Sequence, residues 1–149
     1  MNEATATVRK TMLDALGGRI LESREGYAKG ELPLTEMVMQ PTRVYHAGAI
    51  IALADEVASV AIVGGRATSE DLREGGRLFP YSVQISTNLL DNDPVGPLTA
   101  EARVVRKGRM TVVDTEVFSS TGKKVALMRS THLMVDLKKT GPHKAQAIE

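Results

Sequence analysis

The pattern of hydrophobic positions along the chain predicts one long helix that is apolar on nearly every face. Residues 47–63 read AGAIIALADEVASVAIV and are followed by Gly64-Gly65, which ends the helix. A helix with so little polar surface has to be surrounded by protein. Two adjacent acids inside it, Asp55 and Glu56, break the apolar pattern.

Shorter elements are predicted before this helix, and a loop after it. Apolar residues recur at intervals of four over about residues 4–16, which predicts a short amphipathic helix ended by Gly17-Gly18. A loose alternation over residues 19–39 predicts a β-hairpin region. Residues 66–78 are polar and rich in glycine, and they predict a loop.

The second half of the chain alternates apolar and polar residues with the period of strands. Four strands are predicted, over residues 82–90, 98–104, 110–119 and 125–137. The first is expected to carry Val83, Ile85, Thr87 and Leu89 on one side. The turn at residues 106–109 is expected to place Gly108 at a positive φ. The polar tail over residues 138–149 is predicted to fray.

This order of elements predicts a single α+β domain that spans residues 1–149. The last three strands form an antiparallel meander, and a long sheet can cover an apolar helix by curling around it. One sheet cannot cover every side of such a helix, so a second copy of the chain is implied. We therefore expect a dimer at least.

Composition removes several classes of function. The absence of cysteine excludes disulfides and thiolate metal sites, and it fits a reducing cytoplasm. A net charge of +1 gives no strong field for nucleic acid or an anionic membrane, and aromatic side chains for base stacking are scarce. The N-terminus lacks the apolar run of a secretory signal.

Asp55 is the first candidate for chemistry. A buried ionised carboxylate costs several kcal/mol unless it is paired, so its place in this helix needs a reason. One reason is a general base, and the other is a structural pairing with an arginine or a neighbouring backbone group. Glu56 points about 100° away around the helix and is an equal candidate on this pattern. Ser59, one turn after Asp55, either orients the carboxylate or bonds to the helix backbone.

The start of the long helix offers a second kind of site. Its N–H groups and the positive end of its dipole lie near His46 and Gly48 and can stabilise an oxyanion, although a histidine there is also an ordinary capping residue. The other histidines, His132 and His143, are isolated in the sequence. No metal-ligand spacing, nucleotide-binding loop or serine-hydrolase motif is present.

A basic cluster surrounds one predicted turn. It consists of Arg103, Arg106, Lys107 and Arg109. The first interpretation is a solvated turn. The second is a contact with the phosphates of a nucleotide-bearing thioester such as CoA.

The segment His46-Ala47-Gly48 followed by Asp55 resembles the HGG…D signature of the hotdog-fold thioesterases. Within that fold, the segment is most similar to the superfamily typified by the phenylacetic-acid-degradation thioesterases and the 4-hydroxybenzoyl-CoA thioesterases. Residues 82–90, SVQISTNLL, resemble a strand of that family, and the later GPL, KGR and STGK segments fit its closing strands. The resemblance covers about residues 18–137. It implies a hotdog fold, in which a curved antiparallel sheet wraps a long central helix.

The resemblance also implies an acyl-CoA thioesterase, in which water attacks the thioester carbonyl. Asp55 then corresponds to the general base or nucleophile, and the N–H of Ala47, with Gly48 beside it, corresponds to the oxyanion donor. The supporting positions are Gln40 near the thioester or the attacking water, Ser59 beside the acid, and Ser82 near the water. The expected substrate-binding residues are His46, Ser82, Arg106, Lys107 and Arg109.

The same resemblance implies no metal and no redox cofactor, since CoA enters as part of the substrate. The acid and the oxyanion donor of one site come from different subunits in this family. The expected assembly is therefore a cytoplasmic homodimer or homotetramer with active sites at the subunit interface and no nucleic-acid or membrane partner. The alternatives are a hotdog protein that binds acyl-CoA without hydrolysing it, as a sensor or scaffold, and a hotdog dehydratase or hydratase.

The chain departs from the family pattern at three places, one of which is the loop over residues 66–78, longer and more charged than in compact members. Ala47 replaces the second residue of the usual HGG, which keeps the N–H but adds a β-carbon where the carbonyl should approach. Arg43 lies in a stretch, residues 41–45, where the family often has glycine. These changes leave the expected fold intact and bear on the substrate.

Overall fold

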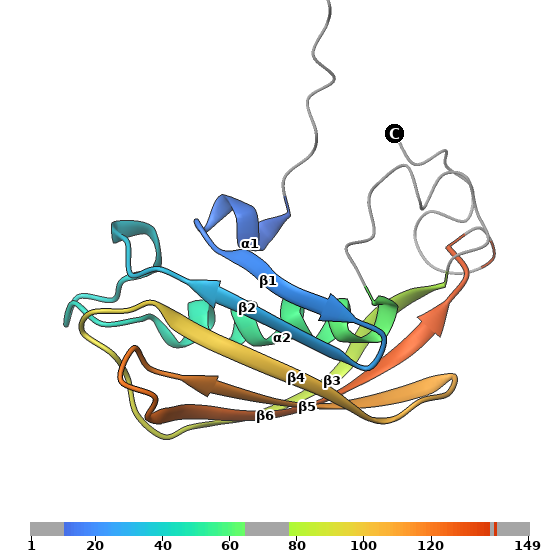
Figure 1. Cartoon of the computed structure of the whole chain (residues 1–149). Helices are drawn as coiled ribbons and strands as arrows, with labels where there is room; N and C mark the ends of the chain where they lie inside the picture. Colours follow the sequence, from blue (N-terminus) through green and yellow to red (C-terminus); the bar gives the residue numbers. More distant parts are fainter. Residues whose placement is uncertain (1–10, 65–77, 138, 140–149) are drawn as a thin grey trace, which may run out of the picture.

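A six-stranded antiparallel sheet curves around one long helix (Figure 1). The computed structural model describes residues 11–64, 78–137 and 139. The elements in chain order are α1 (Met12–Ala15), β1 (Arg19–Arg24), β2 (Tyr27–Leu32), the 3-10 helix η1 (Glu36–Val38), α2 (Ala47–Val63), β3 (Phe79–Leu89), β4 (Leu98–Arg106), β5 (Met110–Phe118) and β6 (Lys124–Val135). This is the arrangement that the resemblance to the hotdog fold implies.

The strand order in the sheet is β1-β2-β4-β5-β6-β3, and every neighbouring pair is antiparallel. The expected hairpin is β1–β2, and the expected three-strand meander is β4–β5–β6. The chain leaves β2, forms α2 across the concave face, and returns at the far edge as β3. Strands β1 and β3 are therefore the two edges of this sheet.

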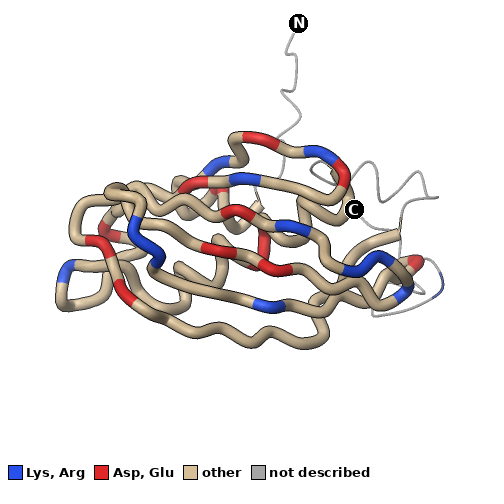
Figure 2. The backbone as a smooth tube through the Cα atoms, turned by 60° about the horizontal axis from the view of Figure 1, so that its bottom comes forward, with Lys and Arg blue, Asp and Glu red and all other residues tan. Residues whose placement is uncertain are grey.

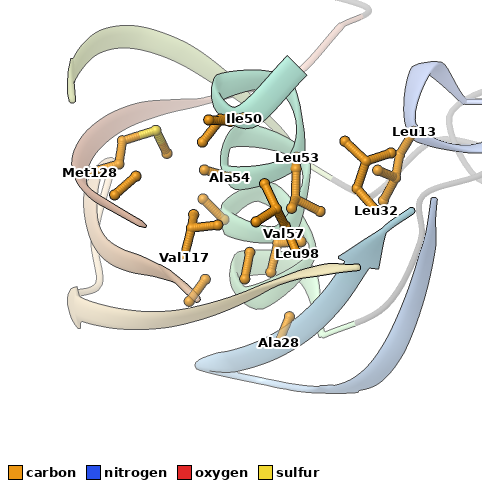
Figure 3. Close-up of a cluster of buried hydrophobic side chains, with 14 of the residues drawn as sticks. Leu13, Ala28, Leu32, Ile50, Leu53, Ala54, Val57, Leu98, Val117 and Met128 are labelled. Atoms are coloured by element: carbon orange, nitrogen blue, oxygen red, sulfur yellow. The ribbon is translucent and has the colours of Figure 1, made fainter. Parts of the chain in front are cut away.

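Helix α2 has the bounds that the sequence predicts. His46 is its N-cap, with an extended backbone, and Gly64 ends it with a φ of 72°, a left-handed conformation that glycine adopts at little cost. Its buried residues are Ala49, Ile50, Leu53, Ala54, Val57, Ala58, Val60, Ala61 and Ile62. Figure 3 shows Leu53, Ala54 and Val57 directed into a cluster with side chains of the curved sheet.

The sheet is shaped to let α2 come close to it. Gly30 of β2 is buried, and a Cβ added there would lie 2.7 Å from Cγ2 of Val57. Real Cβ atoms do not approach other carbons that closely, so the missing side chain of Gly30 sets the spacing between α2 and β2.

Only the C-terminal part of the predicted N-terminal helix lies within the described residues. Its cap is Thr11, whose backbone is extended, so the described helix begins at Met12. Thr11 and Asp14 form a capping box, in which each side chain accepts a hydrogen bond from the backbone N–H of the other. Residues 4–10 of the predicted helix, residues 66–77 of the predicted loop, and most of the predicted tail lie outside the described residues.

The prediction for the face of β3 is wrong at Val83. The pairing of β3 with β6 shifts between Ser82 and Gln84, which marks a β-bulge. The extra residue reverses the alternation, so Val83 does not share a face with Ile85, Thr87 and Leu89. Ser82 instead lies opposite His132, and Ile85 lies opposite Ser130, both on the concave side of the sheet.

The prediction of a positive φ at Gly108 is also wrong, since Gly108 is not among the residues in the left-handed region. The side chain of Thr111 closes this turn. Its hydroxyl donates to the carbonyl of Gly108 at 2.8 Å and accepts from the N–H of Gly108 at 3.3 Å.

Candidate active site

Asp55 and Ser82 meet between the middle of α2 and the start of β3. The hydroxyl of Ser82 donates a hydrogen bond to Oδ1 of Asp55 at 2.7 Å. Asp55 is half-buried rather than fully buried as the sequence predicts. The two residues are far apart in the chain, and the bulge in β3 directs the side chain of Ser82 toward α2.

His132 of β6 extends this contact into the core. Its Nδ1 lies 3.3 Å from Oγ of Ser82, and its Nε2 lies 2.8 Å from Oγ of Ser130. The imidazole is fully buried. Burial lowers the pKa of His132 below its ordinary value, and the charge of Asp55 opposes part of that shift.

The sequence interpretation of His132 as isolated is therefore wrong. A signal was available in the alternation of β6, which places Ser130 and His132 on the same side as the buried Ala126 and Met128. Two polar residues on the core side of a strand indicate a buried polar contact.

Glu56 has a different role from its neighbour. Its Oε2 accepts a hydrogen bond from the backbone N–H of Leu13 at 2.9 Å, in the first turn of α1. The side chain of Leu13 is buried beside the long helix, and Figure 3 places it next to Leu32. Glu56 thus holds α1 against α2, whereas Asp55 faces β3. The structure separates the two acids that the helix pattern left equal.

A cavity of about 300 Å³ opens beside the two acids. Its lining residues are Thr11, Met12, Ala52, Asp55, Glu56, Ser59, Val60, Val63, Phe79 and Pro80. Most of these side chains are apolar, and both carboxylates belong to the lining. Ser59 shares this cavity with Asp55, although no hydrogen bond joins the two.

The helix start carries the predicted cap. Nδ1 of His46 accepts a hydrogen bond from the N–H of Gly48 at 2.9 Å. The N–H of Gly48 is therefore occupied, whereas the N–H of Ala47 makes no hydrogen bond within the described residues. Both residues are at least partly exposed, so this end of α2 is open to a ligand.

The segment before α2 is firmly held. The hydroxyl of the buried Tyr45 donates to the carbonyl of Leu32 at 2.6 Å, and its backbone exchanges two hydrogen bonds with the side chain of Asn92. Burial raises the pKa of Tyr45 to about 12, so the phenol stays protonated and able to donate. These contacts fix the position from which α2 starts.

Gln40 lies in the turn that precedes this segment. Its side chain donates to Oγ1 of Thr42 at 2.7 Å, and its carbonyl accepts from the N–H of Arg43. Arg43 has a φ of 67°, in the left-handed region where the family resemblance leads us to expect glycine. Gln40 and Ala47 thus both lie near the N-terminal end of α2, Gln40 in the turn before it and Ala47 as its first residue.

A single chain does not bring the predicted site residues into one place. Ala47 and Asp55 are eight residues apart on α2, which is a rise of about 12 Å. One thioester carbonyl cannot contact groups with that separation. The structure assembles Asp55, Ser82 and Ser59 around the middle of α2, and Gln40, His46 and Ala47 around its start.

The four basic residues Arg103, Arg106, Lys107 and Arg109 surround the β4–β5 turn, as predicted, and all four are exposed. Lys107 forms an ion pair with Glu25. Arg106 and Arg109 form no ion pair within the described part of the chain. Figure 2 shows basic and acidic residues interspersed along the strands.

The described part of the chain contains neither a cluster of metal ligands nor a membrane-spanning helix. No three His, Asp or Glu side chains gather closely enough there to hold a metal ion. Within residues 11–64, 78–137 and 139, no helix is long and apolar enough to cross a membrane.

The chain resembles known thioester hydrolases in sequence and structure. No family model matches it. It is 29% identical over 119 residues to a 1,4-dihydroxy-2-naphthoyl-CoA hydrolase of Listeria monocytogenes, across 79% of this chain and 90% of that relative. A thioesterase structure from Haemophilus influenzae is 26% identical with a TM-score of 0.70, and the match covers 85% of this chain and 83% of that one.

A third match concerns the ligand. The structure of a hypothetical thioesterase from Streptococcus pneumoniae with coenzyme A is 19% identical, with a TM-score of 0.66. The match covers 79% of this chain and 88% of that one. These matches span most of the chains on both sides.

Proposed function

We propose that this protein, a thioesterase of the hotdog fold, hydrolyses acyl-CoA thioesters with the carboxylate of Asp55. The observation that supports this role most directly is the position of Asp55, half-buried, hydrogen-bonded to Ser82, and at the side of a largely apolar cavity. A carboxylate in such surroundings is partly removed from water and held in one orientation, which suits a base or a nucleophile.

The chemistry follows from the two oxygens of Asp55. Oδ1 accepts from Ser82, so we assign Oδ2 to the attacking water. As a general base, Asp55 takes a proton from the water while the water oxygen adds to the thioester carbonyl. The carbon–sulfur bond then breaks, and CoA leaves as the thiol with the proton that Asp55 held. As a nucleophile, Asp55 attacks the carbonyl, the carbon–sulfur bond breaks and CoA leaves as the thiolate, and water then cleaves the resulting mixed anhydride to the free acid and the carboxylate of Asp55. Neither route requires a metal or a redox cofactor.

The cavity beside Asp55 suits the acyl group. Ala52, Val60, Val63, Phe79 and Pro80 give it apolar walls, and about 300 Å³ is enough for a medium-sized hydrocarbon group. An acyl chain placed there brings its thioester carbonyl to the carboxylate. This lining supports an acyl-CoA whose acyl group is uncharged and apolar.

The oxyanion donor has to come from a second chain, because Ala47 of the same α2 lies about 12 Å from Asp55. Strand β3 is an open edge of eleven residues. Ile85 and Leu89 are 41% and 47% exposed although they lie on the concave side. We propose that the β3 edges of two chains pair, so that each site combines Asp55 of one chain with Ala47 and Gln40 of the other. A tetramer would be two such dimers.

The CoA moiety would then be bound at the rim of the interface. Arg106 and Arg109 are candidates for its phosphates, since they are exposed and guanidinium groups bind phosphate with two parallel hydrogen bonds. Lys107 would have to leave Glu25 to take part.

The first experiment measures thiol release from a panel of short, medium and aryl acyl-CoAs. We expect Asp55→Asn to lower kcat/KM by at least about 100-fold, because the amide can neither accept the proton of water nor attack the carbonyl. Asp114→Asn is the matched control. Asp114 lies on β5 outside the cavity beside Asp55 and pairs with Arg129 on the face opposite the buried Val113, so activity should stay within a few-fold of wild type.

Hydrolysis that is unchanged in Asp55→Asn would refute the role of the acid. Tight binding of acyl-CoA without hydrolysis by the wild type would favour the alternative of a sensor or scaffold. The observation that favours this alternative is the β-carbon of Ala47, which lies where the thioester carbonyl should approach and where the family signature has glycine.

A further inference from the structure

Four polar side chains from three elements form a series of hydrogen-bonding contacts that joins α2 to strands β3 and β6. Asp55 comes from α2, Ser82 from β3, and Ser130 and His132 from β6. The distances are 2.7 Å from Ser82 to Asp55, 3.3 Å from Ser82 to His132, and 2.8 Å from His132 to Ser130. His132 and Ser130 are fully buried, so water does not compete for the contact between them, whereas Ser82 is exposed where it meets Asp55.

The number of protons fixes the direction of each hydrogen bond. The carboxylate of Asp55 can only accept, and Ser82 has a single hydroxyl proton, which it donates to Asp55. The oxygen of Ser82 can then only accept from His132. That contact requires a proton on Nδ1 of His132.

The other ring nitrogen completes the series. A neutral imidazole with its proton on Nδ1 has a bare Nε2, which accepts from the hydroxyl of Ser130. The donation therefore runs from Ser130 to His132, from His132 to Ser82, and from Ser82 to Asp55. Every polar atom of the buried ring is satisfied in this arrangement.

The surroundings of His132 favour the neutral ring. Strand β3 faces it with Ser82 and strand β5 faces it with Thr111, neither of which is charged. Asp55 on α2 is the ionisable group that acts on it, and burial outweighs that charge and lowers the pKa of His132. The ring is therefore neutral at pH 7.

We propose that His132 is a positioning residue for thioester hydrolysis, holding the hydroxyl of Ser82 so that its proton points at Asp55. The proposal rests on the proposed function and adds to it a residue that does not touch the substrate. Without the N–H of His132, the hydroxyl of Ser82 can turn toward the core or toward the attacking water. Asp55 then loses the hydrogen bond that holds its carboxylate in place.

The kinetic test compares two substitutions of His132. His132→Leu removes the donor to Ser82. We expect kcat to fall about tenfold with KM within about twofold, since Asp55 then loses its hydrogen bond from Ser82. In His132→Asn the side-chain amide can place an N–H near the position of Nδ1, so it should recover part of kcat. Equal losses in the two variants would contradict the proposal.

A double-mutant cycle separates positioning from a general effect on the fold. Because His132 acts through Ser82, His132→Leu should cost little further activity in a Ser82→Ala background. Losses that multiply independently would overturn the proposal. Thermal unfolding of each variant identifies any that fail to fold, and Ser130→Ala, which removes only the last donor, provides a milder second perturbation.

A measurement without substrate keeps this inference distinct from the proposed function. We expect nitrogen-15 NMR of histidine-labelled wild-type protein at pH 7 to show His132 neutral, with its proton on Nδ1, assigned by its loss in His132→Asn. A ring protonated on Nε2, or on both nitrogens, would overturn the inference even in an active enzyme. An inactive wild type with the proton on Nδ1 would instead refute the proposed function and, with it, the positioning role.

Discussion

Asp93, in the loop between β3 and β4, is a buried carboxyl whose charge is maintained by backbone N–H groups. It is 3% exposed and accepts hydrogen bonds from the N–H of Val95 at 2.8 Å and of Ser120 at 2.6 Å. Burial alone would raise the pKa of Asp93. The N–H groups of Ser120, Gly96 and Val95 outweigh it and lower the pKa from 3.8 to about 2.

A pKa that is lower in the folded state makes this residue a source of stability at neutral pH. The contribution is complete above the unfolded value of 3.8, and it is lost as the pH falls through about 2. We expect Asp93→Asn to lower the free energy of unfolding at pH 7 by roughly 2 kcal/mol. The variant should also lose less stability than wild type between pH 4 and pH 2.

Urea denaturation at several pH values measures this effect. Asp91→Asn is the control, because Asp91 pairs with Lys123 in an exposed ion pair and should change stability little. An unchanged acid dependence in Asp93→Asn would show that other groups stabilise the protein above pH 4.

Single residues also mark what the sequence could predict of the candidate site. Asp55 stands out because an acid in an apolar helix is costly, and its spacing from His46 carries the family resemblance. His132 has no such spacing. Its contact with Ser82 depends on the register between β3 and β6, which the bulge at Ser82 sets and which short-range patterns do not encode.

Elements were predictable where their signal is long and uninterrupted. Seventeen residues of α2, closed by Gly64, gave its bounds without error. Within the described residues, the N-terminal helix begins at Met12, where Thr11 and Asp14 cap it, and hydrophobic periodicity alone does not reveal such a cap. The face of β3 was misassigned at Val83 because a bulge inserts one residue without changing the local pattern.

The packing of α2 on β2 gives a prediction at the scale of elements. Gly30→Ala places a Cβ 2.7 Å from Cγ2 of Val57, so α2 or β2 has to move. We expect the free energy of unfolding to fall by about 1–3 kcal/mol, the usual cost of overpacking. Denaturation in urea measures the change.

Gly108→Ala is the matched control for this substitution. The nearest atom to a Cβ at Gly108 is the carbonyl oxygen of Met110 at 3.8 Å, and its φ lies outside the left-handed region. Equal stability of the two variants would mean that the sheet yields to α2 without cost.

The whole molecule is a curved sheet that covers one side of its helix. The sequence predicts this shortfall, because α2 is too apolar to be exposed and one sheet is too small to enclose it. The position that we propose for a second chain was not predictable from patterns, since it depends on the edges of the folded sheet. Strands β1 and β3 are both edges, and the exposed Ile85 and Leu89 of β3 are the residues that we expect a partner to cover.

The separation of Ala47 and Asp55 along α2 implies complementation between two inactive variants. Ala47→Pro deletes the N–H at the first helical position, where proline is well tolerated, while Asp55→Asn deletes the base. In a mixed dimer, one site receives both defects and the other receives neither. Mixing equal amounts after subunit exchange should restore about a quarter of wild-type activity, because half of the dimers are mixed and each has one intact site. Each variant alone should stay inactive, and a mixture that also stays inactive would mean that both groups act within one chain.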